Sequence, residues 1–214
     1  MTVQELFDLK GQVAIVTGGG THLGTAMAPA LGELGAAVFI ASRRRSLCEQ
    51  VAGELQKSGI DCTGLGCDVT DEAQVNTLID TVVAKHSRLD IIVCNAGGSA
   101  TTTYIPNASI EEFTLTWETN VKSIYVCAQA AARVMIPQRS GKIITIGSIH
   151  GFTTADLRMY EGLDMKPRSG PPYQTAKGGV INLTRALAAE LGSHGITANC
   201  ISPGQILKPD MDPK

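Results

Sequence analysis

"AIVTGGGTHLGTAMAPAL", residues 14–31, runs from an apolar, β-branched segment through a cluster of glycines into a helical pattern. A turn of this kind leaves backbone N–H groups and the positive end of a helix dipole free to hold an anion, which suits a pyrophosphate. Gly18, Gly20 and Gly24 are spaced one residue more widely than in G-x-G-x-x-G. Tight turns also need glycine for steric reasons alone, so the rest of the chain must support a binding role.

Short β-branched runs alternate with amphipathic segments along the chain. We predict strands at 12–17, 37–42, 62–69, 89–97, 141–148 and 195–202, and helices at 23–34, 46–58, 71–87, 111–137 and 172–192. Continuous apolar strands separated by helices indicate a parallel sheet covered on both faces. The sequence therefore predicts one doubly wound, Rossmann-like α/β domain over residues 1–214. The long irregular segment 149–170 has a length that usually carries a function.

The composition is that of a globular protein, which we expect to be cytoplasmic. Hydrophobic residues make up 43% and charged residues 18% of the chain, and a net charge of −2 argues against a nucleic-acid partner. The N-terminus has no signal-like pattern, and no apolar run approaches the roughly 18 residues that cross a bilayer. The six cysteines have neither C-x-x-C nor histidine-containing metal spacing, so we expect reduced thiols and no bound metal.

Tyr173 and Lys177 lie four residues apart in "SGPPYQTAKGGV", residues 169–180. Proline is tolerated in the first turn of a helix, so Pro171 and Pro172 predict a helix start and place the pair on one helix face. Such a pair occurs by chance on many helices. It is either an ordinary surface contact or an acid with the cation that tunes it, and the pair alone does not decide between them.

A series of motifs, in order along the chain, resembles those of the short-chain dehydrogenase/reductase family. The motifs are the glycine turn with Thr17, Gly18 and Gly24, then Asp68–Val69, Asn95–Ala96–Gly97, Asn120, Ser148, the Tyr173/Lys177 pair and Pro203–Gly204. Each motif is loose alone, but their joint order over residues 12–204 is specific. The resemblance implies an oxidoreductase with catalytic residues Asn120, Ser148, Tyr173 and Lys177. It also implies that a nicotinamide dinucleotide is bound by Thr17, Gly18, Gly20, His22, Leu23, Gly24, Ser42, Arg43, Asp68, Val69, Asn95, Ala96, Gly97, Lys177, Pro203 and Gly204.

The implied chemistry explains these residue types. Reduction of a carbonyl by hydride needs a proton for the oxygen, and a phenol can give it if a nearby ammonium lowers its pKa from about 10. We therefore expect Lys177 to lower the pKa of Tyr173. By resemblance, Lys177 also holds the nicotinamide ribose, Ser148 hydrogen-bonds the substrate oxygen and Asn120 anchors a water chain. Ser148 could instead only cap a strand end, and Asn120 could be a helix surface residue. We expect His150 to be a loop or cleft-wall residue.

The choice of dinucleotide depends on the end of the second predicted strand. An acidic residue there would bind the ribose 2′-OH of NAD, whereas an arginine accommodates a 2′-phosphate. This chain has Ser42 and Arg43 at that point and no acid. Arginine offers a planar fork that suits phosphate, so we predict NADP(H), with NAD as the alternative.

Two features within the chain depart from the family pattern. His22 stands where the family has its middle glycine, and an imidazole there could crowd a pyrophosphate or donate to it. Ser148 and Tyr173 are 25 residues apart, which is about twice the usual spacing. The polar residues between them suit a polyhydroxylated or acidic substrate, so the sequence looks closest to gluconate 5-dehydrogenase-like and sugar-modifying members. The alternative is a solvated loop that never touches substrate. The extra polar residues are Asp156, Arg158, Tyr160, Glu161, Asp164, Lys166 and Arg168.

The chain ends at "PGQILKPDMDPK", residues 203–214, before the covering segment and last strand usual in the family. We therefore expect either a C-terminally truncated form without that strand or an incomplete sequence, with Lys208 in place of the family's threonine. Two interpretations remain. One is an oxidoreductase acting on a sugar acid, polyol or related polar small molecule; the other is a non-catalytic nucleotide-binding or interaction protein. We expect a homo-oligomer, at least a dimer through the helices after strands 4 and 5, without nucleic-acid or membrane partners.

Overall fold

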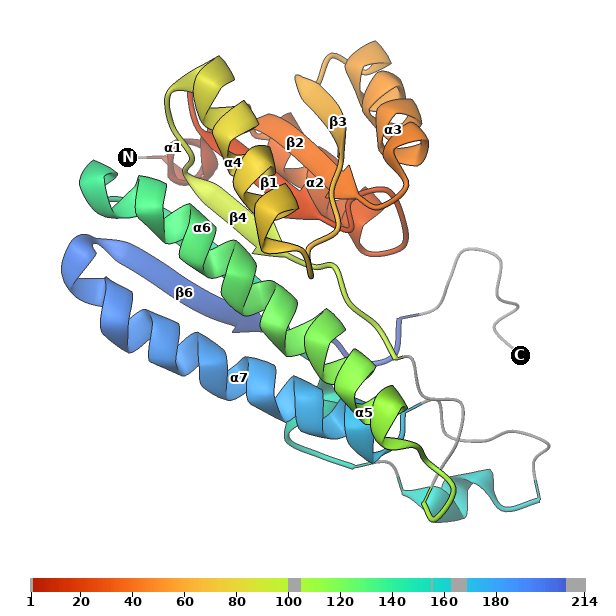
Figure 1. Ribbon diagram of the computed structural model, residues 1–214. Helices are drawn as coiled ribbons and strands as arrows, with labels where there is room; N and C mark the ends of the chain where they lie inside the picture. Colours follow the sequence, from red (N-terminus) through yellow and green to blue (C-terminus); the bar gives the residue numbers. More distant parts are fainter. Residues whose placement is uncertain (1, 100–104, 155, 163–168, 207–214) are drawn as a thin grey trace.

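Six parallel strands form one sheet in the computed structural model, which describes residues 2–99, 105–154, 156–162 and 169–206 (Figure 1). The strand order is β3-β2-β1-β4-β5-β6, so the order reverses between β1 and β4. At a reversal of this kind the loops after neighbouring strands leave toward opposite faces, which opens a crevice at the carboxyl ends. The strands are β1 (Val13–Thr17), β2 (Ala37–Ser42), β3 (Cys62–Gly66), β4 (Ile91–Cys94), β5 (Gly141–Ile146) and β6 (Ile196–Ile201).

Helices cover both faces of the sheet, which confirms the doubly wound prediction (Figure 1). Buried side chains of α2 and α3 pack on one face, and those of α4, α6 and α7 pack on the other. The helices are α1 (Val3–Phe7), α2 (Gly24–Glu33), α3 (Arg45–Lys57), α4 (Glu72–His86), α5 (Ile110–Trp117), α6 (Ser123–Gln138) and α7 (Pro171–Leu191). Short helical turns are η1 (Glu118–Lys122), η2 (Ile149–Gly151), η3 (Leu157–Tyr160) and η4 (Gly192–His194).

The observed boundaries differ from the predicted ones mainly at the carboxyl ends of the strands. The strands predicted to end at 69, 97 and 148 stop at Gly66, Cys94 and Ile146. The residues that follow leave the hydrogen-bonded ladder and form the rim of the crevice. The single helix predicted at 111–137 consists of α5, the π-helical turn η1 and α6.

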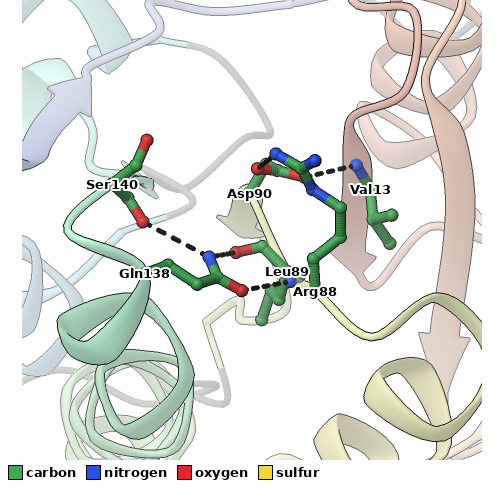
Figure 2. A network of polar contacts seen from close by, with 6 residues as sticks. All are labelled: Val13, Arg88, Leu89, Asp90, Gln138 and Ser140. Carbon is green, nitrogen blue, oxygen red and sulfur yellow. Dashed lines mark hydrogen bonds and ion pairs between the residues drawn. The ribbon is translucent and has the colours of Figure 1, made fainter.

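A polar network at the opposite end of the sheet ties β1, β4 and α6 together (Figure 2). Asp90 is 4% exposed and accepts a 2.9 Å hydrogen bond from the Val13 N–H and a bidentate pair from Arg88. Gln138 donates to the Leu89 carbonyl and accepts from the Leu89 N–H. Because this network satisfies buried backbone groups at the amino ends of two central strands, it belongs to the scaffold of the sheet.

Candidate active site

A cleft of about 760 Å³ opens at the carboxyl ends of the strands. It extends from the loop after β2 to the first turns of α7, so residues far apart in sequence meet there. Of the predicted site residues, the following line it: Gly18, His22, Leu23, Ser42, Arg43, Asp68, Val69, Asn95, Ala96, Gly97, Ser148, Tyr173, Lys177, Pro203 and Gly204. Four others, Thr17, Gly20, Gly24 and Asn120, are not among the lining residues.

Steric fit explains two of the glycines in the turn after β1. A Cβ on Gly24 would lie 2.2 Å from the Gly18 carbonyl oxygen, and a Cβ on Gly18 would lie 2.9 Å from the Asn95 amide nitrogen. Gly18 also has a φ of 67°, which glycine adopts without strain. Gly18 therefore packs closely against the residues that follow β4, and Gly24 packs closely against Gly18.

The amino end of α2 is open to an anion. Leu23 is its N-cap residue and supplies no side-chain cap. Within the described part of the chain, the backbone N–H groups of His22 and Leu23 donate no hydrogen bond. Unpaired donors at a helix N-terminus, facing a cleft, form an arrangement that binds phosphate groups.

Thr17 and Asn95 join the first and fourth strands beneath this turn. Thr17 is buried; its hydroxyl donates to the Val93 carbonyl and accepts from the N–H groups of Asn95 and Ala96. The Asn95 amide donates to the carbonyls of Thr17 and Gly18 at 2.9 and 3.2 Å. Both side chains are thus engaged with the backbone, and they fix the floor of the cleft.

The loops after β2 and β3 form the far end of the cleft. Arg43 is exposed there, and Ser42 accepts a hydrogen bond from the Arg44 N–H. The hydrogen bonds of the Thr70 N–H and hydroxyl hold the pKa of Asp68 below its usual value, and Arg43 lowers it further. Arg45 forms an ion pair with Glu49, whereas Arg43 and Arg44 line the cleft. This end can hold an anionic group beside Arg43.

Asn120 lies in the π-helical turn between α5 and α6 and is fully buried. Its amide donates to the carbonyls of Gly98 and Thr116 at 2.7 and 2.8 Å, and its oxygen accepts from the Gly98 N–H. A Cβ on Gly97 would lie 2.8 Å from that oxygen. Asn120 therefore clamps the loop after β4, and π-helical turns of this kind are frequent at functional sites.

Ser148 and Tyr173 meet across the cleft despite the 25 residues between them. Ser148 follows β5, and Tyr173 lies in the first turn of α7, which begins at Pro171 as predicted. Burial of the phenol raises the pKa of Tyr173 above 10, and a hydrogen bond with Ser148 opposes this in part. The expectation that Lys177 lowers this pKa is wrong for this structure, because burial dominates.

Lys177 is 5% exposed and donates a 2.7 Å hydrogen bond to the Ile146 carbonyl. Its ammonium lies 5.6 Å from the centroid of the Tyr173 ring, close to the phenol but directed at the end of β5. Burial lowers the pKa of Lys177 from 10.5 to about 8, and Cys200 opposes the shift. The site thus carries a neutral phenol beside a buried and easily deprotonated ammonium.

The segment after Ser148 contributes less to the cleft than the sequence suggested. Asp156 and Arg158 form an exposed ion pair with each other, and neither lines the cleft. His150 is also outside the lining residues, and its Nδ1 is buried without a partner in the described structure. Asp164, Lys166, Arg168 and Lys208 lie outside the described residues.

Sequence reasoning missed several lining residues that adjoin the recognised motifs. Their only signal is this adjacency, because no pattern of their own marks them. They are Thr21, Arg44, Cys67, Thr70, Gly98, Thr119, Ile146, Gly147, Gln205 and Ile206. In the described ranges, no helix is long and apolar enough to cross a membrane, and no cluster of three metal-binding side chains occurs.

Comparison with known proteins places this architecture in a family. Residues 12–214 match the short chain dehydrogenase family. The chain is 40% identical over 200 residues to (+)-borneol dehydrogenase 1 of Salvia officinalis, covering 93% of this chain and 71% of that protein. It is 35% identical over 202 residues to a mitochondrial borneol dehydrogenase of Lavandula x intermedia, covering 94% and 71%. A solved short-chain type dehydrogenase/reductase from Mycobacterium marinum is 36% identical, with a TM-score of 0.87 and coverage of 95% and 78%.

Proposed function

This chain belongs to the short-chain dehydrogenase/reductase family, and on that premise we propose that it is an NADP(H)-dependent oxidoreductase that interconverts a secondary alcohol and its ketone. The observation that carries the proposal is the meeting of Ser148, Tyr173 and Lys177 in one cleft with an uncapped helix N-terminus. A proton donor and an anion site are the two elements that dinucleotide-dependent carbonyl reduction requires of the protein.

The residues of the cleft fit a nicotinamide dinucleotide. The free N–H groups before α2 would hold its pyrophosphate, Arg43 would lie at its adenosine end, and Lys177 would hold the nicotinamide ribose. When bound, the dinucleotide supplies or accepts the hydride. The remaining chemistry falls to side chains of this chain.

Proton transfer is the task we assign to Tyr173. Its raised pKa keeps the phenol protonated near neutral pH, which is the form that donates to a carbonyl oxygen. Ser148 hydrogen-bonds the same oxygen and orients it toward Tyr173, while Asn120 holds the loop after β4 in place. In the reverse reaction the same side chain would accept the proton of the alcohol.

Arg43 supports the choice of NADP(H) over NAD(H). Its side chain is exposed at the end of β2 and lines the cleft, with no acidic residue at that strand end to bind a 2′-OH. A guanidinium binds phosphate through two parallel N–H donors, which gives a 2′-phosphate a specific partner.

Different features of the chain favour two different classes of substrate. The charged segment after Ser148 favours a polyol or sugar acid, as in the predicted gluconate 5-dehydrogenase-like group. Against this, Asp156 and Arg158 bind each other, and the same segment exposes Phe152, Leu157 and Met159. Two of the three relatives reported above are named for borneol, a hydrophobic alicyclic alcohol. We therefore favour a hydrophobic secondary alcohol of the borneol type.

The experiment is a panel of alcohols assayed with NADP⁺ and with NAD⁺ by the absorbance of the reduced nicotinamide. We expect turnover of borneol and related cyclic alcohols, with polyols and gluconate as the competing class. Binding of neither dinucleotide, together with no turnover, would overturn the proposal. Dinucleotide binding without any turnover would favour the non-catalytic interpretation, which has no support in the comparisons.

A homodimer is also part of the proposal. α5 exposes Ile110, Phe113, Leu115 and Trp117, and α6 exposes Tyr125, so the helices after β4 carry an apolar surface. Light scattering of the purified protein tests this, and a monomer at micromolar concentration would contradict it. Cytoplasmic location remains a prediction that fractionation can test.

A further inference from the structure

The backbone of His22 has an unusual conformation. Its φ is 51°, in the left-handed region that L-residues rarely adopt. Ser87 and Arg139 are the other non-glycine residues with positive φ in the described chain, and both are C-cap residues where this conformation ends a helix. His22 precedes the N-cap of α2, so helix termination does not explain its conformation.

The side chain at this position has room that its neighbours lack. Gly18 and Gly24 could not carry a Cβ without colliding with backbone or with Asn95, as described above. His22 instead is exposed and lines the cleft. A strained conformation inside a ligand-binding turn is a reason to look for a role of the side chain in binding.

The electrostatic surroundings favour an anion near His22. Arg43 and Arg44 line the same cleft, and Asp68 is the one carboxylate among its described lining residues. Asp68 is already engaged by the N–H and hydroxyl of Thr70. The unpaired backbone N–H groups of His22 and Leu23 add further donors in the same turn.

We infer that His22 is a cofactor-binding residue whose imidazole donates a hydrogen bond to the pyrophosphate of the dinucleotide. This inference rests on the proposed function, since it requires a dinucleotide in the cleft. The imidazole would add a side-chain donor to the free backbone N–H groups of the turn. Because NADH and NADPH share the pyrophosphate, His22 contributes equally to the binding of both.

The test measures dissociation constants of NADH and NADPH by calorimetry for the wild type, His22→Gly and His22→Asn. Glycine adopts positive φ freely, so His22→Gly should fold, which thermal unfolding of the free protein checks. Loss of a hydrogen bond to a charged group should weaken both cofactors by about tenfold and by the same factor. His22→Asn tolerates the left-handed region and retains an N–H donor, so it should recover part of the affinity.

Arg43→Ala is the matched control, because it should weaken NADPH alone. Equal or tighter binding of both cofactors by His22→Gly would overturn the inference and show that the imidazole crowds the site. A loss confined to NADPH would also overturn it, since that would place His22 at the 2′-phosphate. Failure of the proposed function itself looks different, because the wild type would then bind neither cofactor.

Discussion

Replacing Lys177 with methionine removes a buried charge while keeping a side chain of similar length. The ammonium is 5% exposed, and burial lowers its pKa from 10.5 to about 8. The folded state therefore bears a cost for holding this charge away from water, which the single hydrogen bond to the Ile146 carbonyl offsets only in part. We predict that Lys177→Met changes the pH dependence of stability in a defined direction.

The magnitude follows from the pKa of Lys177. Between about pH 8 and 10.5 the folded chain releases this proton and the unfolded chain keeps it, so the unfolded state binds more protons and stability rises with pH. Below about pH 8 both states are protonated and the full cost applies. A pKa difference of 10.5 − 8, about 2.5, corresponds to about 3 kcal/mol. Roughly 2 kcal/mol of this is recovered by about pH 9.5.

Urea unfolding followed by circular dichroism measures this effect. Lys177→Met loses the hydrogen bond to Ile146 at every pH, so that loss cancels when two pH values are compared. Relative to the variant, the wild type should gain about 2 kcal/mol between about pH 7 and pH 9.5. Lys142→Met, which removes an exposed lysine of β5, controls for the loss of one charge. A wild-type-minus-variant difference that is equal at both pH values would refute the reasoning.

The remaining predictions concern the cofactor and the scaffold. Arg43→Ala should weaken NADPH by about 10- to 100-fold with little change for NADH, because it removes the guanidinium from a 2′-phosphate; calorimetry giving equal losses for both would contradict it. Asp90→Ala should lower the free energy of unfolding by about 1–3 kcal/mol in urea, because the buried Val13 N–H loses its acceptor. Asp156→Ala, which removes an exposed bidentate pair, should leave stability nearly unchanged, and equal losses in the two variants would contradict the assignment of the cost to Val13.

Local patterns predicted most of the fold. The β-branched runs became strands of a parallel sheet, and the double proline at 171–172 marked the start of α7. These features depend on local propensity and periodicity, which the sequence carries directly. The π-helical turn η1 was missed because it inserts one residue into an otherwise continuous helical pattern. Its Asn120 makes a long-range contact with Gly98, which a local pattern does not reveal.

The sequence predicted which residues form the candidate site better than it predicted their pKa values and contacts. Motif order named Ser148, Tyr173 and Lys177, and the fold brings them together. The predicted direction of the Tyr173 pKa shift was wrong because burial of the phenol is a tertiary property that residue spacing does not encode. Likewise, two of the polar residues predicted to suit a polar substrate, Asp156 and Arg158, form an ion pair with each other.

The central claim is that Tyr173 gives the proton in carbonyl reduction, and a single-turnover measurement with Tyr173→Phe tests it most directly. The ketone is whichever one the substrate panel identifies, and saturating NADPH isolates the chemical step. Phenylalanine keeps the ring and removes the hydroxyl, so the step should slow by roughly 10² to 10⁴ while NADPH affinity stays within about twofold. Tyr125→Phe on α6, whose ring lies outside the cleft, should react as the wild type does. A Tyr173→Phe protein that keeps more than about a tenth of the wild-type rate would contradict the account.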